Sequence, residues 1–284
     1  MPSTELPSNQ SSESILMCPV CHSLLVKSER TFHCENRHSF DQAKEGYINL
    51  LLVNQKSSKN PGDSTEMLLA RREFLDAEYY QPIAKGIAEC IEEVELGANK
   101  SHALLDCGCG EGYYLNQLRK NLKDQWQTYG LDISKDGVRL AAKRYKESGW
   151  ICASGEHLPI MDNSLDVLLR VFAPGNNSEV YRVLNEKGIL INVSPGENHL
   201  IEIKSALYDE IKPYAIPNTP EGFFSDNIKK IKYNIALNDN KSVKQLLSMT
   251  PFMWKGKREA RDALKEKDSL SVTVDMDIHC YKKQ

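Results

Sequence analysis

The stretch that decides the fold class reads Leu104-Leu105-Asp106-Cys107-Gly108-Cys109-Gly110-Glu111-Gly112-Tyr113-Tyr114. An apolar run ends in the acidic residue Asp106, and glycines at alternate positions then lead into a helical pattern. Glycine tolerates positive φ and lets the backbone approach a ligand that lies over the ends of parallel strands. The stretch therefore predicts a small-molecule site where a buried strand turns into a helix.

Features around this stretch distinguish the site from a dinucleotide site. The dinucleotide pattern is Gly-x-Gly-x-x-Gly, whereas the third glycine here comes one residue early. Asp106 would repel a pyrophosphate but suits the ammonium of a methionine moiety. Asp132, about twenty residues on, can accept both ribose hydroxyls, and residues 154–159 can flank an adenine. This order favours an S-adenosylmethionine-dependent methyltransferase over a dehydrogenase. The residues that it nominates for the cofactor are Asp106, Gly108, Gly110, Glu111, Asp132, His157 and Leu158.

Short apolar runs alternate with helical patterns along the rest of the chain, which predicts βαβ units and a parallel sheet. The C-terminal residues 271–278 alternate with period two, which predicts a half-exposed antiparallel strand late in the sheet. We expect an α/β, Rossmann-like class I methyltransferase with a mostly parallel seven-stranded sheet. The strand-like runs are residues 103–106, 129–132, 150–153, 166–169 and 188–193.

A second motif lies near the N-terminus, where Cys18-x2-Cys21 is followed by Cys34-x3-His38. Two closely spaced pairs joined by a loop suit tetrahedral Zn²⁺, and three thiolates with one imidazole leave no open position. His22 and His33 each adjoin a cysteine and are less suitable, so His38 is preferred. Residues 15–52 hold too little apolar content for a core of their own. We expect a small zinc-ribbon-like module with a structural metal.

Composition divides the chain into four parts. Residues 1–14 are rich in Ser, Pro and Glu and are expected to be disordered; residues 15–53 form the zinc-binding module. Residues 54–62 read as a linker, and 63–284 as the methyltransferase domain. Asp63 with Glu66 suggests a helix N-cap pair.

Charge and cysteine usage limit the partners and the compartment. The formal net charge of −3 is not the signature of a nucleic-acid binder, but residues 15–62 carry six basic against four acidic side chains, and residues 222–284 carry thirteen against eight. Such basic flanks suit an anionic polymer or are merely solvated faces. Eight cysteines placed as metal ligands or in apolar runs indicate a reducing compartment. Without a secretory signal or an apolar run of membrane length, a cytoplasmic protein that contacts no membrane is expected.

Further motifs are spread along the chain: Cys18-Pro19-x-Cys21, residues 40–51, 62–64, 70–75, 80–82, 108–114, 172–174, 195–200 and 250–252. With these motifs the chain resembles the bacterial large-subunit ribosomal RNA (guanine-N1)-methyltransferases. The resemblance implies methyl transfer from S-adenosylmethionine to N1 of a guanine in a hairpin loop of 23S rRNA. It also implies zinc on the four predicted ligands and cofactor contacts from Tyr80, Gly112, Tyr113 and His199. Members differ in which neighbouring guanine they modify, and the sequence leaves this open.

The residues that would perform the chemistry are less well marked. Guanine N1 carries a proton that must leave, so a general base would help. Asp162 is one hypothesis; another is that no residue abstracts the proton and a donor such as Arg170 stabilises the charge on O6. The basic side chains expected to grip RNA are Lys27, Arg30, Arg37 and Lys44 in the zinc module, with Arg71 and Arg72 near the first helix of the catalytic domain.

Other functions fit part of the sequence. One alternative is a methyltransferase acting on a small molecule, with zinc as a structural clip; another is a cofactor-sensing or RNA-binding module that has lost catalysis. The sequence leaves the oligomeric state open, with a homodimer through the zinc module as one option.

Overall fold

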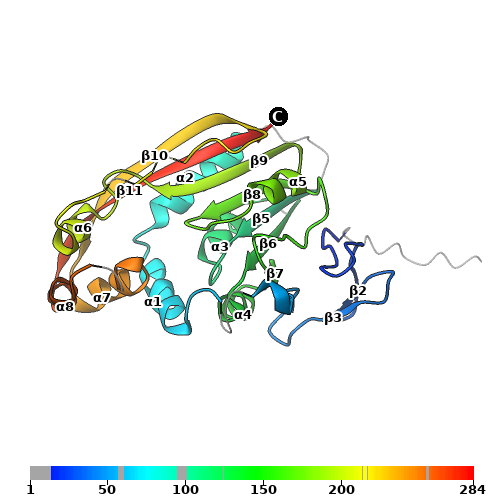
Figure 1. The fold of residues 1–284 in the computed structure, drawn as a ribbon, viewed down its shortest axis with the longest axis horizontal. Coiled ribbons are helices and arrows are strands. Elements are labelled where there is room, and N and C mark those ends of the chain that lie inside the picture. The colour runs from blue at the N-terminus through cyan, green and yellow to red at the C-terminus, as the bar shows by residue number, and fades with distance from the viewer. Residues whose placement is uncertain are drawn as a thin grey trace, which may run out of the picture.

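The computed structural model describes residues 14–56, 61–94, 101–123, 125–212, 214–215, 217–253 and 256–284. The expected disordered segment 1–14 lies outside these residues except for Ser14, as do residues 57–60 of the expected linker. Figure 1 shows an elongated molecule with the N-terminal module (blue) at one end. At the other end lie the helices α6 (Ile201–Leu207), α7 (Asn240–Ser248) and α8 (Arg258–Lys265).

The described residues form two sheets. The smaller one is an antiparallel meander within the N-terminal module, in the order β1-β2-β3: β1 Val26–Ser28, β2 Thr31–His33 and β3 Ser39–Asp41. The larger one has eight strands in the order β10 Phe223–Leu237, β11 Leu270–Lys283, β9 Leu184–Pro195, β8 Leu165–Val171, β5 His102–Cys107, β6 Trp126–Asp132, β7 Gly149–Cys152 and β4 Tyr47–Asn49.

The expectation of seven strands in the large sheet is wrong, because the N-terminal module contributes an eighth. The strand β4 pairs in parallel with β7, with Tyr47 opposite Trp150 and Asn49 opposite Cys152. Tyr47 and Ile48 are buried. Pairing with the large sheet therefore buries apolar side chains that the small module could not bury by itself. Three residues are too few to give a periodic signal of their own.

The C-terminal strand β11 is antiparallel, as predicted, but it is not half-exposed. It lies between β10 and β9, and both of its faces are covered. A Cβ on Gly86 of helix α2 (Gln81–Glu92) would come within 2.9 Å of the Ile278 side chain on one face. On the other face Asp275 is buried and accepts a hydrogen bond from the backbone N–H of Asn198 at 2.9 Å.

Helices flank the sheet and carry the connections between its strands (Figure 1). Ser64, and not Asp63, is the N-cap of the first helix, and its side chain accepts the backbone N–H of Met67. The helices are α1 Thr65–Asp76, α2 Gln81–Glu92, α3 Tyr113–Arg119, α4 Lys135–Arg144, α5 Asn177–Val183, α6 Ile201–Leu207, α7 Asn240–Ser248 and α8 Arg258–Lys265, with 3₁₀ turns at Val53–Gln55 and Pro251–Met253.

Buried apolar side chains form two clusters. The second cluster is shared: Leu16, Leu25 and Phe32 of the N-terminal module belong to it together with Leu105 and Ile151 of the large sheet. The strands β4 to β9 are all mutually parallel, so their carboxyl ends meet at one edge. That edge is where ligands bind in open α/β sheets.

Candidate active site and metal centre

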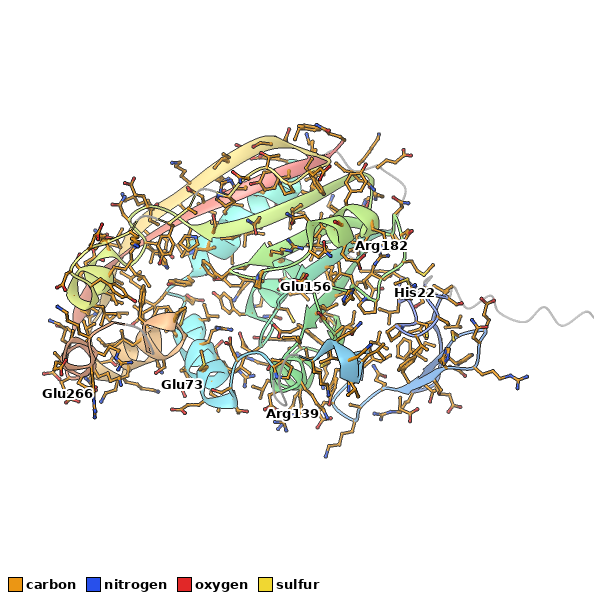
Figure 2. The ribbon with its side chains drawn as sticks, in the orientation of Figure 1. His22, Glu73, Arg139, Glu156, Arg182 and Glu266 are labelled. Atoms are coloured by element: carbon orange, nitrogen blue, oxygen red, sulfur yellow. The ribbon has the colours of Figure 1, made fainter. Side chains whose placement is uncertain are left out.

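A cavity of about 1490 Å³ opens at the carboxyl ends of β5, β6, β8 and β9. Its wall runs from the glycine loop after β5 to helix α6 and the segment after α7. Glu156, which lines it, lies near the middle of the molecule between the two ends (Figure 2). Among the described residues on the wall are Arg71, Tyr80, Gly108, Glu111, Tyr113, Asp132, Ser154, Gly155, Phe172, His199, Lys204, Tyr208, Tyr214 and Phe252.

The glycine loop is closed by Asp132 at the end of β6. Its two carboxylate oxygens accept the backbone N–H groups of Gly110 at 2.8 Å and of Ser134 at 2.7 Å. Gly108 and Gly112 both adopt φ +88°, and a Cβ at these positions would lie 2.3 Å from Ala173 and 2.5 Å from Trp150 respectively. The loop therefore requires glycine on two counts, conformation and space.

Asp106 is buried at the end of β5, one residue before Cys107, which lines the cavity. Burial, and then the nearby charge of Asp132, raise the pKa of Asp106 to about 8, and the nearby Leu115 backbone N–H offsets part of this rise. Neither oxygen has a partner at normal hydrogen-bonding geometry among the described residues. Such an orphaned carboxyl group fits a cationic ligand group, which would favour its charged form.

Tyr80 and His199 lie on the cavity wall, as do Tyr113 and Glu111. Tyr80 is buried, with its ring edge-on to Phe74 at 5.2 Å and tilted to His199 at 6.4 Å. Burial lowers the pKa of His199 to about 4, so its ring is neutral at physiological pH. The buried Glu111 pairs with Arg72 across 3.4 Å.

Asp106, like the remaining nominated cofactor residues, is not on the cavity wall formed by the described residues. Gly110 and Gly112 shape the loop from behind. His157 is exposed, and Leu158 is buried in the second apolar cluster. Instead, the preceding residues Ser154, Gly155 and Glu156 line the cavity.

The cavity wall beyond the glycine loop contains residues that were not predicted from the sequence. Phe172, directly after β8, is 45 % exposed with φ +56°, and its ring stacks parallel to His199 at 6.4 Å. Lys204 of α6 and Tyr214 complete this wall. The Phe172-Ala173-Pro174 motif was a signal for the first of these, but an isolated lysine in a short helix gives none.

Neither sequence-based candidate for catalysis belongs to the described residues of the cavity wall. The Asp162 carboxylate accepts a hydrogen bond from Arg182 Nη1 at 2.6 Å, and its side chain is 64 % exposed. Arg170 is buried and donates to the Asn177 side chain at 2.9 Å and to the Asn176 carbonyl at 3.1 Å. Arg170 therefore orders the turn before α5.

The six basic residues expected to contact RNA are in different settings. Arg71 lines the cavity and pairs with Asp63, whereas Arg72 pairs with Glu111. Arg30 donates to the carbonyls of Gln42 and Ala43 and so holds the module together. Lys27 lies 5.6 Å above the Phe32 ring, and Lys27, Arg37 and Lys44 are exposed.

The structure brings together the four predicted metal ligands, Cys18, Cys21, Cys34 and His38, whose ligand atoms all lie within 4.8 Å of one another. Cys21 Sγ is 3.5 Å from Cys34 Sγ, and His38 Nδ1 is 3.4 Å from Cys34 Sγ. These spacings suit a tetrahedron around one ion with bonds of about 2.0–2.3 Å. His22 and His33 are exposed and stand outside the cluster.

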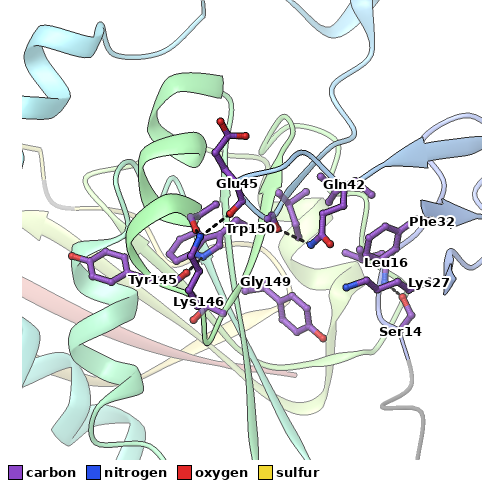
Figure 3. Close-up of a pocket in the computed structure, with 16 residues that line it drawn as sticks. Ser14, Leu16, Lys27, Phe32, Gln42, Glu45, Tyr145, Lys146, Gly149 and Trp150 are labelled. Carbon is purple, nitrogen blue, oxygen red and sulfur yellow. Dashed lines mark hydrogen bonds between the residues drawn. The ribbon is translucent and has the colours of Figure 1, made fainter. Parts of the chain in front are cut away.

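A smaller pocket of about 350 Å³ lies where the N-terminal module meets the large sheet (Figure 3). Lys146 donates to the carbonyls of Glu45 and Ala142, and Gln42 donates to the carbonyl of Gly46. The Lys146 bonds join the module to helix α4. Lys27 also lines this pocket, so this basic side chain lies at the junction.

The parallel sheet, the glycine loop and the strand-end acids define a class I S-adenosylmethionine-dependent methyltransferase with an appended zinc ribbon. Family models agree: one described as a methyltransferase domain matches residues 105–192, and a zinc-ribbon model described as RlmA, N-terminal, matches residues 16–59.

Relatives extend the match over most of the chain. YxjB of Bacillus subtilis (strain 168), provisionally named a 23S rRNA (guanine-N1)-methyltransferase, is 33 % identical over 93 % of this chain and 96 % of its own. The 23S rRNA (guanine(748)-N1)-methyltransferase of Streptomyces fradiae is 36 % identical over 68 % of this chain and 67 % of its own. The chain belongs to the 23S rRNA (guanine-N1)-methyltransferase family, and S-adenosylmethionine and structural zinc are its cofactors.

No helix in the described part of the chain is both long and apolar enough to span a membrane.

Proposed function

We propose that this enzyme transfers the methyl group of S-adenosylmethionine to N1 of one guanine in a hairpin loop of 23S rRNA. The observation that carries the proposal is the size and continuity of the cavity. At about 1490 Å³ it exceeds the roughly 300–1,000 Å³ of a typical small-ligand site. One continuous space can therefore hold the cofactor over the glycine loop and a base extruded from the RNA beside Phe172.

The half of the cavity at the glycine loop holds the cofactor in this proposal. Asp106 pairs with the ammonium of the methionine moiety, and Asp132 accepts the ribose hydroxyls with the lone pairs that the loop leaves free. The adenine lies against residues 154–156, which line the cavity, with His157 and Leu158 supporting them from behind. Tyr80, Glu111, Tyr113 and His199 complete the wall, and Gly108, Gly110 and Gly112 keep the backbone close to the ligand.

Zinc on Cys18, Cys21, Cys34 and His38 has a structural role, because four protein ligands leave no position for a substrate. The module of residues 15–53 is joined through residues 54–62 to the catalytic domain of 63–284. The exposed Lys27, Arg37 and Lys44 face solvent and can reach phosphates, whereas Arg30 and Arg72 support structure as well. Arg71 lies where the RNA would enter the cavity.

The relatives favour this activity over methylation of a small molecule. A cytoplasmic location suits an enzyme acting on ribosomal RNA. The homodimer considered from the sequence has no support in these observations and is not part of the proposal.

The test is incorporation of labelled methyl from S-adenosylmethionine into protein-free 23S rRNA that lacks the modification, followed by nucleoside analysis. We expect one N1-methylguanosine per molecule, and mapping its position identifies the guanine. Absence of product from both protein-free rRNA and large ribosomal subunits, with cofactor binding intact, would refute the proposed substrate.

A further inference from the structure

Lys204 of helix α6 is buried, with 5 % of its surface exposed, although it belongs to the wall of the cavity. Its Nζ atom has no hydrogen-bond partner among the described residues. The Nζ atom lies 3.9 Å from the centre of the Tyr214 ring, so an aromatic face is its main neighbour. A lysine has three donors, and no described residue accepts a hydrogen bond from any of them.

Such a group is costly to bury. Burial without a counter-charge disfavours an ammonium, and desolvation accordingly lowers the pKa of Lys204. A methionine would fill the same volume without this cost. The ionisable groups near Lys204 include the phenol of Tyr214 and the neutral His199, on which the charges of Glu202 and Asp275 also act. Glu202 accepts hydrogen bonds from Thr273, and Asp275 accepts one from Asn198. Tyr208, Glu210 and Lys212 are also on the cavity wall. None of these described groups pairs with Nζ, which leaves its donors free for an acceptor that enters the cavity.

The reaction in the proposed function supplies such an acceptor. When guanine N1 attacks the methyl carbon, the N1–H bond breaks and its proton goes to water. The N1 electron pair forms the new N–C bond, and the methyl–sulfur electron pair stays on sulfur. As the proton leaves, negative charge is shared between N1 and the neighbouring O6. A donor held at O6 stabilises that charge without being itself a base.

We propose that Lys204 is a catalytic residue that donates a hydrogen bond to O6 of the target guanine and stabilises its N1-deprotonated form. The inference rests on the proposed function and specifies how the acceptor half of the cavity works. In this structure the face of the Tyr214 ring lies against Nζ. When the base enters, its O6 atom replaces the ring as the neighbour of Nζ. The stacked pair of Phe172 and His199 offers the flat apolar surface against which the purine lies. Lys204 thus takes the role that the sequence assigned to Arg170.

The experiment compares the wild type with Lys204→Met, Lys204→Arg and a matched control, Lys187→Met, which alters an exposed lysine at the far end of β9. Turnover is measured at saturating cofactor and hairpin RNA from about pH 6 to 9, and S-adenosylhomocysteine affinity by calorimetry. Loss of one oxyanion donor reduces turnover by about 10²–10³-fold. We expect this loss for Lys204→Met, partial rescue by Lys204→Arg, and no change for Lys187→Met.

Three readouts separate this role from a structural one. Lys204→Met should melt at the same or a higher temperature than the wild type, because it removes a buried unpaired charge. The remaining activity of Lys204→Met should rise with pH, because guanine N1 then loses its proton without help from a donor at O6. With 6-thioguanine at the target position, whose N1 proton is more acidic and whose sulfur accepts hydrogen bonds weakly, the difference between the wild type and Lys204→Met should shrink.

Normal turnover and an unchanged pH profile in Lys204→Met would overturn the inference while leaving the proposed function intact. Loss of S-adenosylhomocysteine affinity that matches the loss of turnover would also overturn it, because Lys204 would then hold the cofactor. A wild type that makes no N1-methylguanosine on hairpin RNA, on protein-free 23S rRNA or on large ribosomal subunits would instead refute the proposed function, and this inference with it.

Discussion

The zinc module and the active-site cavity are assembled in opposite ways. The four metal ligands lie between Cys18 and His38, twenty positions apart, whereas the cavity wall draws on residues from Gly62 to Phe252. The module has three-residue strands and a cluster of four metal ligands, whereas the large sheet has apolar side chains packed on both faces. Local spacing therefore determines the metal site, whereas tertiary packing determines the active-site cavity. Comparable substitutions in the two regions should have different effects.

The largest difference should follow loss of the metal. Structural zinc contributes about 10–16 kcal/mol of folding free energy in small domains, so Cys34→Ser should unfold the module and release β4 from β7. The sheet from β5 onward should stay folded because its first apolar cluster contains none of the metal ligands, although Cys18 and Cys34 belong to the second. Limited proteolysis read by mass spectrometry should show cleavage within residues 15–53 and resistance beyond 101.

A matched control is Cys90→Ala, which removes a buried thiol from the sheet side and should leave zinc content and the proteolytic pattern unchanged. A zinc-free Cys34→Ser protein that still resists cleavage in the module would contradict the dependence on metal.

A pair of glycines compares the two regions directly. Gly46 of the module has φ +111° with open space around its Cβ direction, while Gly112 has φ +88° with Trp150 2.5 Å away. Gly46→Ala should destabilise the protein by about 1–2 kcal/mol through conformation alone. Gly112→Ala should add overpacking and reach about 2–5 kcal/mol. Chemical denaturation measures both, and equal losses would show that the loop relaxes around the added methyl.

Asp132 tests whether the cofactor loop depends on distant residues. In Asp132→Ala the N–H groups of Gly110 and Ser134 lose their acceptor, and the ribose loses its partner. Hydrogen bonds to a charged group contribute about 1.5–3 kcal/mol, so cofactor affinity should fall roughly 10- to 100-fold by calorimetry. Asp76→Ala, which removes an exposed ion pair with Arg144, should leave that affinity unchanged; a similar loss in both would refute a specific role.

The smallest effect concerns protons at Asp106, whose pKa is raised to about 8. Between about pH 4 and 8 the folded chain holds this proton more tightly than the unfolded chain does. The contribution of Asp106 to stability therefore falls as pH rises through this range. Binding of a cationic cofactor should release the proton, seen near pH 7 as less than one proton per site by calorimetry in buffers of different ionisation enthalpy. Asp106→Asn should abolish the release, and its persistence would assign it to another group.

The comparison also explains what the sequence could predict. The metal ligands and the glycine loop could be predicted because each belongs to a short segment of the chain in which residue type and spacing determine the chemistry. The period-two pattern of residues 271–278 correctly predicted a strand, but its exposure depends on α2 and on the segment around Asn198, which no local pattern encodes. The N-cap of the first helix is Ser64 and not the expected Asp63. The sequence pattern does not distinguish between these two adjacent residues, because both types cap helices well.

The misses in the active site have a common physical cause. Asp162 and Arg170 follow the expected strand ends in sequence, yet their partners Arg182 and Asn177 hold them outside the cavity wall. Lys204 carries no sequence signal, because its significance comes from its burial beside Tyr214 with no hydrogen-bond partner among the described residues, and only tertiary packing creates that setting.

The pairing of β4 with β7 has a consequence for the solubility of the chain. An uncovered strand edge presents unpaired backbone groups that invite pairing with another molecule. Here the edge of β7, with the buried Trp150 and Ile151, is protected by three residues supplied from the module. A chain shortened to begin at residue 61 would expose this edge, so we expect it to aggregate at concentrations where the full chain stays dispersed. The zinc ribbon thus also shields the catalytic sheet from self-association.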